Sequence, residues 1–220
     1  MVHASLRAVG VRAEVLLEHV LDVIGPEGTL CMVLGADSDE PFDVHETEVD
    51  VEDMGVLAEV FRTFPGVTCS DHAAARWGAV GPHATTLLAD PPLHDYHGPK
   101  GTLQRLVDLD GVVLRLGASP DTVTLTHLAE YLARVPGKRW VERTYVRADT
   151  GPQLISSLDD DGSFVEADPE GTYFPEVYRA FAATDGVTRG PVGSCAAESF
   201  AASHFVAFAV RWLEGRFGWP

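Results

Sequence analysis

The chain has 220 residues, of which 45% are hydrophobic and 22% are charged, a composition typical of a globular domain rather than a disordered or fibrous chain. Acidic residues outnumber lysine and arginine by 33 to 16, and the resulting net charge of −17 argues against a protein that neutralises nucleic-acid phosphates. A polycationic ligand, in contrast, would be attracted to such a surface. Because many proteins are acidic for solubility alone, the charge by itself leaves both interpretations open.

The cysteines and the N-terminal segment indicate the compartment. Cys31, Cys69 and Cys195 are odd in number, and no two of them have the spacing of metal ligands or of a disulfide framework. Residues 1–7 lack the apolar run of a signal peptide, and no stretch approaches the roughly 18 apolar residues of a membrane span. We therefore expect a reduced, cytoplasmic protein, a monomer or a homodimer, with no nucleic-acid or membrane partner.

The first elements in chain order are a strand, a helix and a second strand. Residues 1–5 resemble the end of a strand, and the apolar spacing over 13–24 predicts a helix that stops at Gly25-Pro26. Residues 29–34 are predicted to form a buried strand. This order is a βαβ pattern, which favours an α/β fold with a largely parallel sheet.

The middle of the chain alternates loops with short elements. Residues 37–53 carry nine acidic side chains and are predicted to form a long loop, followed by a helix over 54–64 that ends before Pro65. Further loops are predicted at 71–76 and at 91–101, the second of which is rich in histidine and proline.

The second half contains the clearest strand, Gly111–Gly117, which is almost wholly apolar and is expected to be central. A helix over 124–135 follows it, and strands are predicted at 140–146 and 154–158. A long amphipathic helix is predicted from about Ala196 to Phe217. With no internal repeat or linker visible, we expect one three-layer α/β/α domain over residues 1–220 with a mixed, largely parallel central sheet.

A candidate catalytic pair follows the predicted central strand. His127 and Glu130 are three residues apart and would share one face of a helix, at the end of a strand where open α/β sheets build their sites. Histidine is the usual base near neutral pH, and a carboxylate beside it raises its proton affinity and orients its ring. The same spacing also occurs as an incidental surface pair, so the spacing alone does not decide.

Other motifs are incomplete. His94 and His97 have a spacing that suits zinc, but no third ligand is evident near them. Asp159–Asp161 lacks the length and the later glutamate of a calcium loop, and Gly117–Asp121 lacks the second glycine of a nucleophile elbow. No glycine-rich phosphate-binding motif is found. We expect no metal site.

Short segments along nearly the whole chain match one family in sequence and in order. They are Val2–Gly10, Gly25–Leu30, Pro41–Asp43, Gly55–Arg62, Val113–Gly117, Asp121–Thr122, Thr126–Glu130, Thr188–Gly190 and Phe208–Gly218. These segments resemble the aminoglycoside 3-N-acetyltransferases of the antibiotic N-acetyltransferase family. The resemblance implies an α/β fold, acetyl-coenzyme A as cofactor, and acetyl transfer to the 3-amino group of the 2-deoxystreptamine ring of aminoglycoside antibiotics.

The sequence departs from the family at several places. The helix and most of a strand that usually precede the segment beginning at Val2 are not part of it, so the sequence is short for the family at this end. Ser70–Ala73 keeps a histidine but lacks the proline that usually follows, Arg76 stands where a small polar residue is usual, and Gly101-Thr102 replaces a frequent Ser-Pro. These differences concern the rim of the site and hence the range of substrates.

The resemblance also implies roles for individual residues. His127 would be the general base, and Glu130 would orient His127 or hold an ammonium group of the substrate. The loop and helix start at Ser5–Arg12 offer backbone N–H groups to a pyrophosphate, although a capping role for Ser5 fits equally well. The expected cofactor-binding residues are His3, Ser5, Leu6, Arg7, Ala8, Val9 and Thr122. The expected substrate-binding residues are Asp37, Asp71, His72, Asp95 and Asp121.

Two alternative functions stay open at this point. One is the same acetyl transfer to a different amine, and the other is a catalytically impaired relative that binds aminoglycosides without acetylating them. The presence of both His127 and Glu130 favours an enzyme. An assay of thiol release from acetyl-coenzyme A would separate the three.

Overall fold

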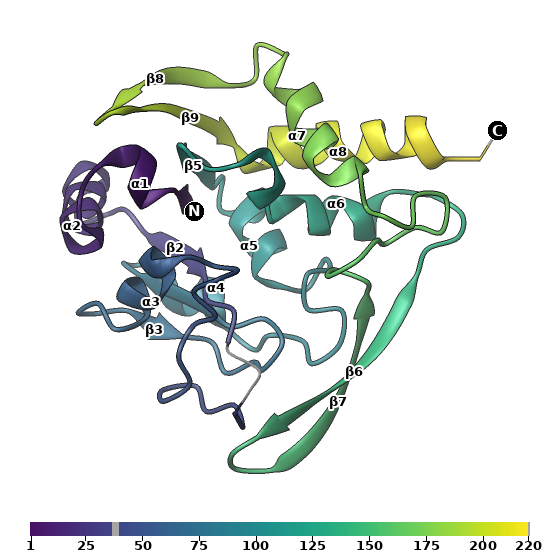
Figure 1. Ribbon diagram of the computed structural model, residues 1–220, viewed down its shortest axis with the longest axis horizontal. Helices are drawn as coiled ribbons and strands as arrows, with labels where there is room; N and C mark the ends of the chain where they lie inside the picture. Colours follow the sequence, from purple (N-terminus) through teal and green to yellow (C-terminus); the bar gives the residue numbers. More distant parts are fainter. Residues whose placement is uncertain (37–39, 220) are drawn as a thin grey trace.

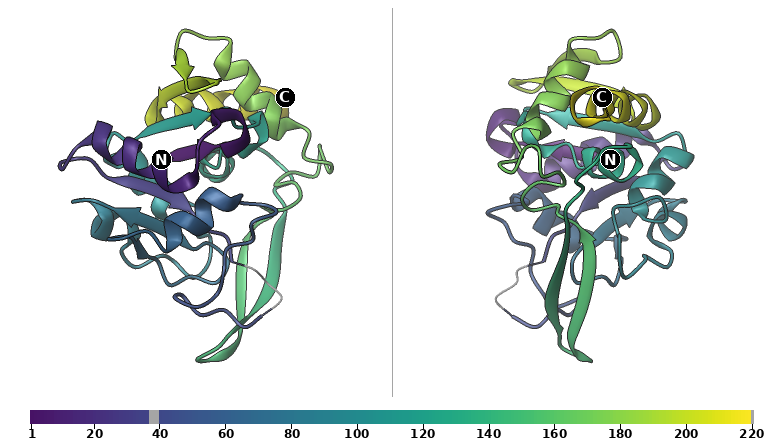
Figure 2. Two further views of the ribbon diagram at one scale, coloured as in Figure 1. Left: turned by 60° about the vertical axis from the view of Figure 1, so that its left-hand side comes forward. Right: turned by 90° about the vertical axis from the view of Figure 1, so that its right-hand side faces the viewer.

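The computed structural model describes residues 1–36 and 40–219, in which helices pack around three β-sheets (Figure 1). The smallest sheet is a long hairpin of β6 (Trp140–Arg147) and β7 (Gly151–Leu158), which projects from the body of the molecule in each view of Figure 2. None of the described helices is both long and apolar enough to span a membrane.

Strands from both ends of the chain form the largest sheet. β1 (Val2–Ala4) pairs in parallel with β5 (Val112–Leu116), and β5 pairs on its other side with antiparallel β9 (Cys195–Ala201). β8 (Thr188–Val192) follows at the edge of the sheet, antiparallel to β9. The prediction that the apolar segment 111–117 is a central strand is confirmed.

The second sheet corrects the predicted strand pairing. β2 (Leu30–Val33) pairs antiparallel with β4 (Trp77–Val80), which also pairs with β3 (Thr68–Cys69). The α/β class and the mixed sheet are confirmed, but the expectation of a largely parallel sheet is not, because β1 and β5 form the one parallel ladder between the described strands. The strand that changes the pairing, β4, was not predicted.

Helices cover the sheets. They are α1 (Leu6–Val9), α2 (Ala13–Ile24), α3 (Val56–Arg62), α4 (Ala84–Leu88), α5 (Thr102–Asp108), α6 (Leu125–Leu132), α7 (Tyr173–Ala182) and α8 (Ala202–Phe217), with a 3-10 turn, η1, at Pro120–Thr122. The predicted helix over 13–24 is confirmed. It ends at Gly25, which has a φ of 66° that L side chains rarely adopt.

The predicted C-terminal helix is confirmed only from Ala202 onward. Residues 195–201 form β9, in which the buried residues Ala197 and Phe200 lie on opposite faces of the sheet and belong to different hydrophobic clusters. A spacing of three between buried residues in an alanine-rich segment resembles the start of a helix, whereas the pairing of β9 between β5 and β8 makes the segment a strand.

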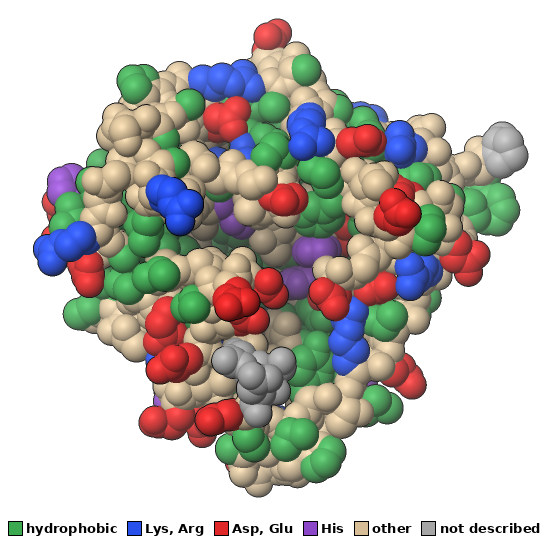
Figure 3. Space-filling model, viewed as in Figure 1, with side chains coloured by type: hydrophobic (Ala, Val, Ile, Leu, Met, Phe, Trp, Pro, Cys, Tyr) green, Lys and Arg blue, Asp and Glu red, His purple; other side chains and the backbone are tan. Residues whose placement is uncertain are grey.

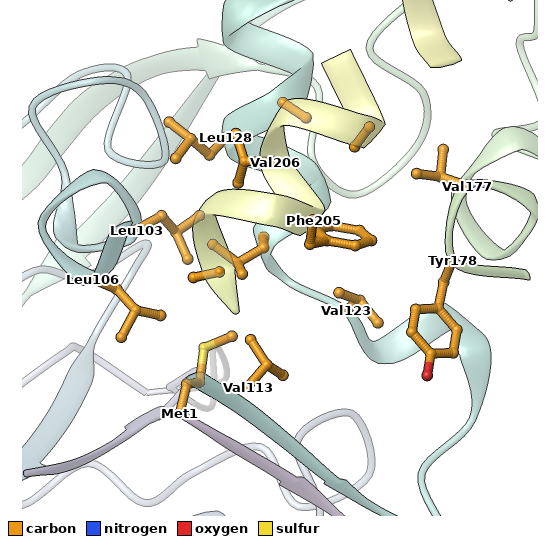
Figure 4. Packing of buried hydrophobic residues seen from close by; sticks show 14 of the residues in the cluster. Met1, Leu103, Leu106, Val113, Val123, Leu128, Val177, Tyr178, Phe205 and Val206 are labelled. Atoms are coloured by element: carbon orange, nitrogen blue, oxygen red, sulfur yellow. The ribbon is translucent and has the colours of Figure 1, made fainter. Parts of the chain in front are cut away.

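The largest hydrophobic core holds α6 in place (Figure 4). Leu125, Leu128 and Ala129 of α6 are 0% exposed and lie in the same cluster as Phe205 and Val206 of α8. Burying a large apolar side chain of this kind contributes roughly 1.5–3 kcal/mol. The apolar face of α6 thus fixes the helix against the core and leaves its other residues to form a site.

Candidate active site

A cleft of about 470 Å³ is lined by residues of β1, β2 and the start of α6, together with the loops before α3 and after β5. Figure 3 shows a hollow in the middle of one face of the molecule, with histidine side chains inside it and acidic side chains around it. The lining includes His97, His127 and Asp160, which come from three distant parts of the sequence.

His127 lies in this cleft with its ring held by Glu130. The His127 Nδ1 is 3.0 Å from Glu130 Oε2, and the Tyr173 hydroxyl donates to Glu130 Oε1 at 2.7 Å. Because an ionised carboxylate only accepts hydrogen bonds, Nδ1 carries the proton of the neutral imidazole and Nε2 has a free lone pair. Glu130 is 1% exposed, so it positions His127 and does not reach a ligand.

The surroundings of His127 favour its protonated form. Burial by itself would lower the pKa of His127, but the charge of Glu130, the hydrogen bond to it and the charge of Asp160 together raise that pKa above its usual value. The same carboxylates therefore stabilise the imidazolium that forms when His127 accepts a proton.

Two rings pack against the His127 imidazole. His97 stacks on it with the centroids 5.0 Å apart and the planes 10° apart, and Phe174 lies 4.9 Å away at 46°. Burial, followed by the charge of His127, lowers the pKa of His97 to about 3, so His97 is neutral near physiological pH. The packing restrains rotation of the His127 ring without placing a second cation beside it.

Asp160 is a partly buried carboxylate that faces the same cleft. It accepts hydrogen bonds from the Tyr96 hydroxyl and from Arg143 Nη1, both at 2.6 Å, and its Oδ2 is 3.7 Å from His97 Nε2. Burial would raise the pKa of Asp160, but the charge that His97 carries at low pH, the charge of His127 and these hydrogen bonds lower it, so the group is ionised. From the sequence, this segment was considered only as a calcium loop, and it lacks the length and the later glutamate that such a loop needs.

Three of the expected cofactor-binding residues line the cleft: His3, Ser5 and Thr122. Burial is the main reason why the pKa of His3 falls to about 3, and His3 Nε2 is buried without a hydrogen-bond partner in the described part of the chain. The Ser5 Oγ accepts from the Ala8 N–H at 3.4 Å and so caps α1, as the alternative interpretation expected. The other expected residues, Leu6, Arg7, Ala8 and Val9, form α1 and do not line the cleft.

Most of the expected substrate-binding residues do not line the cleft. Asp121 lines the cleft, whereas Asp71 pairs with Arg147 at 2.9 Å and Asp95 lies 3.3 Å from the Tyr131 hydroxyl, both outside the lining. Asp37 lies outside the described residues. The other carboxylates that line the cleft are Glu52, Asp53 and Asp160; the first two belong to the predicted acidic loop 37–53, and Asp160 was not considered as a substrate contact from the sequence.

His72, the other histidine considered for the substrate, has a structural environment. Its Nδ1 accepts from the N–H groups of Ala74 and Ala75 at 3.2 and 3.0 Å, and its Nε2 lies 3.2 Å from the Leu93 carbonyl oxygen. Because both ring nitrogens are engaged and the residue is 3% exposed, His72 holds loops together and has no free nitrogen for a ligand.

Comparison with known proteins identifies the family of this chain. The family profile described as aminoglycoside 3-N-acetyltransferase matches residues 1–214. Aminoglycoside N(3)-acetyltransferase III of Pseudomonas aeruginosa is 36% identical, over 99% of this chain and 88% of that protein, and aminoglycoside N(3)-acetyltransferase VII of Streptomyces paromomycinus is 34% identical, over 99% and 86%.

Solved structures agree in fold. AAC-IIIb in a binary complex with CoASH superposes with a TM-score of 0.93 at 33% identity, covering 100% of this chain and 91% of that one. AAC-VIa bound to sisomicin gives a TM-score of 0.91 at 29% identity, with coverage of 100% and 91%. The chain therefore belongs to the aminoglycoside 3-N-acetyltransferase family, and the family resemblance expected from its short segments is confirmed.

Proposed function

We propose that the protein transfers the acetyl group of acetyl-coenzyme A to the 3-amino group of the 2-deoxystreptamine ring of an aminoglycoside, with His127 as the general base. The observation that carries this proposal is the His127–Glu130–Tyr173 chain of hydrogen bonds inside the cleft. Solved structures of similar proteins support this choice of substrates, since one contains CoASH, another sisomicin and a third a gentamicin.

The chemistry assigned to His127 is proton removal from the attacking amine. An aminoglycoside amine is mostly protonated at neutral pH and must lose a proton before or during attack. The ammonium group first loses one proton to solvent. As the neutral amine nitrogen then bonds to the thioester carbonyl carbon, His127 Nε2 removes a second proton from it, the C–S bond breaks, and this second proton passes from His127 to the departing thiolate. General-base catalysis of this type typically contributes a factor of about 10² to 10⁴ in rate.

Glu130 acts through His127 rather than on the substrate. Its two carboxylate oxygens are taken by His127 and Tyr173, and its burial leaves no room for an ammonium group. Of the two roles considered for Glu130, orientation of His127 is the one that the geometry supports. It is a positioning residue.

Acetyl-coenzyme A fits the side of the cleft formed by β1 and by the loop after β5. There His3 Nε2 is a buried ring nitrogen without a partner in the described residues, which a bound amide or thioester group would satisfy. Ser5 and Thr122 line the same side, and the exposed side chain of Arg7 supplies a cation for the phosphates. When bound, the cofactor supplies the acetyl group as an activated thioester.

The acceptor amine fits the acidic part of the cleft. Glu52, Asp53, Asp121 and Asp160 line it, and a substrate with several ammonium groups would meet several of these carboxylates at once. Single exposed ion pairs contribute little, so affinity for a polycation depends on several carboxylates facing one cleft.

The direct test is turnover. The protein is incubated with acetyl-coenzyme A and a kanamycin- or gentamicin-type aminoglycoside, thiol release is followed, and the acetylated nitrogen is located by NMR. Release of one thiol per product acetylated at the 3-amine supports the proposal. Release with only a different amine supports acetylation of another substrate, and tight binding without release supports the impaired binder.

A further inference from the structure

Arg76 is a buried cation that lies outside the catalytic chain of hydrogen bonds. It directly precedes β4, is 0% exposed, and every hydrogen bond that its side chain makes in the described residues goes to a backbone carbonyl oxygen. A charge buried in this way is costly unless its donors are satisfied, and the planar guanidinium fixes the directions from which acceptors approach. The oxygens around Arg76 are therefore held in defined positions.

Those oxygens belong to two segments that are far apart in sequence from Arg76. The Arg76 Nε donates to the Leu34 carbonyl oxygen at 3.0 Å, at the end of β2. Its Nη1 donates to Thr47 at 2.6 Å and to Val44 at 3.4 Å, and its Nη2 donates to Glu48 at 3.2 Å, in each case to the carbonyl oxygen. Arg76 thus ties the segment 44–48 to the second sheet.

The tied segment continues into the wall of the active-site cleft. Residues 43–54, here named the acidic wall, contain six carboxylate side chains and no lysine or arginine. At the end of the wall Glu52, Asp53 and Met54 line the cleft that also contains His127. The same cleft contains the buried His97 Nδ1, a ring nitrogen without a hydrogen-bond partner in the described part of the chain.

Arg62 also donates a hydrogen bond to the acidic wall, but the two arginines differ in whether the charge is paired with a carboxylate. Arg62 donates to the His45 carbonyl oxygen, but its charge is paired with Glu59 at 2.7 Å. Arg76 makes no ion pair within residues 1–36 and 40–219. Its side-chain hydrogen bonds in these residues go instead to backbone carbonyl oxygens, so Arg76 acts on the wall by holding the backbone of residues 44–48 in place.

We infer that Arg76 is a specificity-determining positioning residue, which holds the acidic wall so that Glu52 and Asp53 face the cleft and receive ammonium groups of the acceptor substrate. The inference rests on the proposed function in that the acceptor is a polyammonium sugar. It assigns Arg76 no part in proton transfer, because His127 and Glu130 lie on α6, which is fixed by the hydrophobic core.

Steady-state kinetics on two variants test this role. Arg76→Met removes the charge at similar length, and it should raise the KM for the aminoglycoside about 10-fold while kcat and the KM for acetyl-coenzyme A stay within about twofold. Arg76→Lys keeps the charge but not the fork of donors and should fall between the wild type and Arg76→Met. A merely structural loss would reduce the fraction of active enzyme, and so kcat, without raising the KM for the amine alone.

Arg105 offers a matched control. It also donates to backbone carbonyl oxygens, those of Leu87 at 3.2 Å and of Asp90 at 3.3 Å, but neither segment lines the cleft. Arg105→Met should therefore leave the KM for the amine unchanged. An equal rise in that KM for Arg105→Met and Arg76→Met, or no rise for a folded Arg76→Met enzyme, overturns the inference.

Two further measurements cover the remaining outcomes. If Arg76→Met does not fold, the double variant Glu52→Gln/Asp53→Asn carries the test, and an unchanged KM for the amine in it overturns the inference. Hydrogen exchange of amides 43–54 needs no substrate, and it should be faster in Arg76→Lys than in the wild type while exchange in α6 is unchanged. Wild-type enzyme that releases no thiol with any aminoglycoside would count against the proposed function, whereas unchanged exchange in the acidic wall would count against the role of Arg76.

Discussion

Helix α6 and the acidic wall face the same cleft, but different forces hold them in place. Leu125, Leu128 and Ala129 anchor α6 in a core from which water is excluded. The wall is exposed over much of its length and is held by hydrogen bonds to Arg76 and by the Glu59 carboxylate, which accepts from the Val49 N–H at 2.9 Å. Proton transfer depends on placement within fractions of an ångström, which a packed helix provides, whereas recognition of a flexible polycation tolerates a polar loop.

The largest loss of activity is expected when the proposed base on α6, His127, is removed. His127→Ala should lower kcat by about 10² or more with little change in the KM for acetyl-coenzyme A. His127→Asn, whose side-chain amide places an N–H near the position of the imidazole Nδ1, should lose as much activity while keeping the buried carboxylate satisfied. The measurement is thiol release at saturating substrates.

The exposed histidine of α2 gives the control for this change. Among the residues that the structure describes, His19 bonds only to the Val15 carbonyl oxygen, and His19→Ala should have wild-type kcat. A His127→Ala enzyme that retains nearly full kcat would falsify the assignment of the base.

A smaller effect on the same side is expected from Glu130→Gln. The uncharged amide keeps the shape but no longer offsets burial, so the pKa of His127 should fall. The neutral form of His127 is the active base, so activity is lost as the pH falls through this pKa. The acidic limb of the pH profile of kcat/KM should therefore move to lower pH, and kcat should fall about 10-fold because the ring is less well oriented and is a weaker base.

His97 separates this explanation from a general disturbance of the site. Its pKa of about 3 lies below the range of the assay, so the limb does not belong to His97. A limb that stays in place in Glu130→Gln, in an enzyme that is still folded, would mean that a group other than His127 controls the profile.

The contrast between the two regions also explains what the sequence could predict. Helix α6 and its catalytic pair could be predicted from local sequence. The apolar spacing indicates a helix, and His127 and Glu130 share a face of it at a spacing of three. The partners of the base do not, because Tyr173 is 43 residues from Glu130, and His97 and Asp160 meet His127 only through the fold. No local signal connects them.

The same reason accounts for the errors in the fold and in the acidic site. The predicted loop 37–53 was identified as acidic, but which of its carboxylates face the cleft depends on Arg76, 29 residues from Thr47. β4 contains Gly78, where a Cβ would lie 2.6 Å from Leu34 Cδ1, and its pairing with β2 follows from this close packing rather than from a strand pattern. Strand order is set by such contacts between distant segments.

A third change tests whether the cofactor and the amine bind at different parts of the cleft. Replacing Ser5 and Arg7 together by alanine should raise the KM for acetyl-coenzyme A about fivefold, because a hydroxyl and a charge near the phosphates are lost. The KM for the amine should stay within about twofold. Arg211→Ala, an exposed arginine of α8, is the control and should change neither value. Equal weakening of both substrates would count against placing the cofactor beside β1.

The smallest expected effect comes from ionic strength and concerns the acidic side alone. Raising the salt concentration from about 0.05 to 0.5 M shortens the screening length about threefold. Exposed carboxylates such as Glu52 and Asp53 should then attract ammonium groups less, and the Kd for the aminoglycoside, measured by calorimetry, should rise several-fold. The Kd for acetyl-coenzyme A should change less, since salt also screens the repulsion between its phosphates and a chain of net charge −17.

The double variant Glu52→Gln/Asp53→Asn should show a weaker salt dependence of the aminoglycoside Kd than the wild type does. An aminoglycoside Kd that does not respond to salt would mean that the wall contributes shape rather than charge, and the partly buried Asp160 would then be the carboxylate on which amine binding depends.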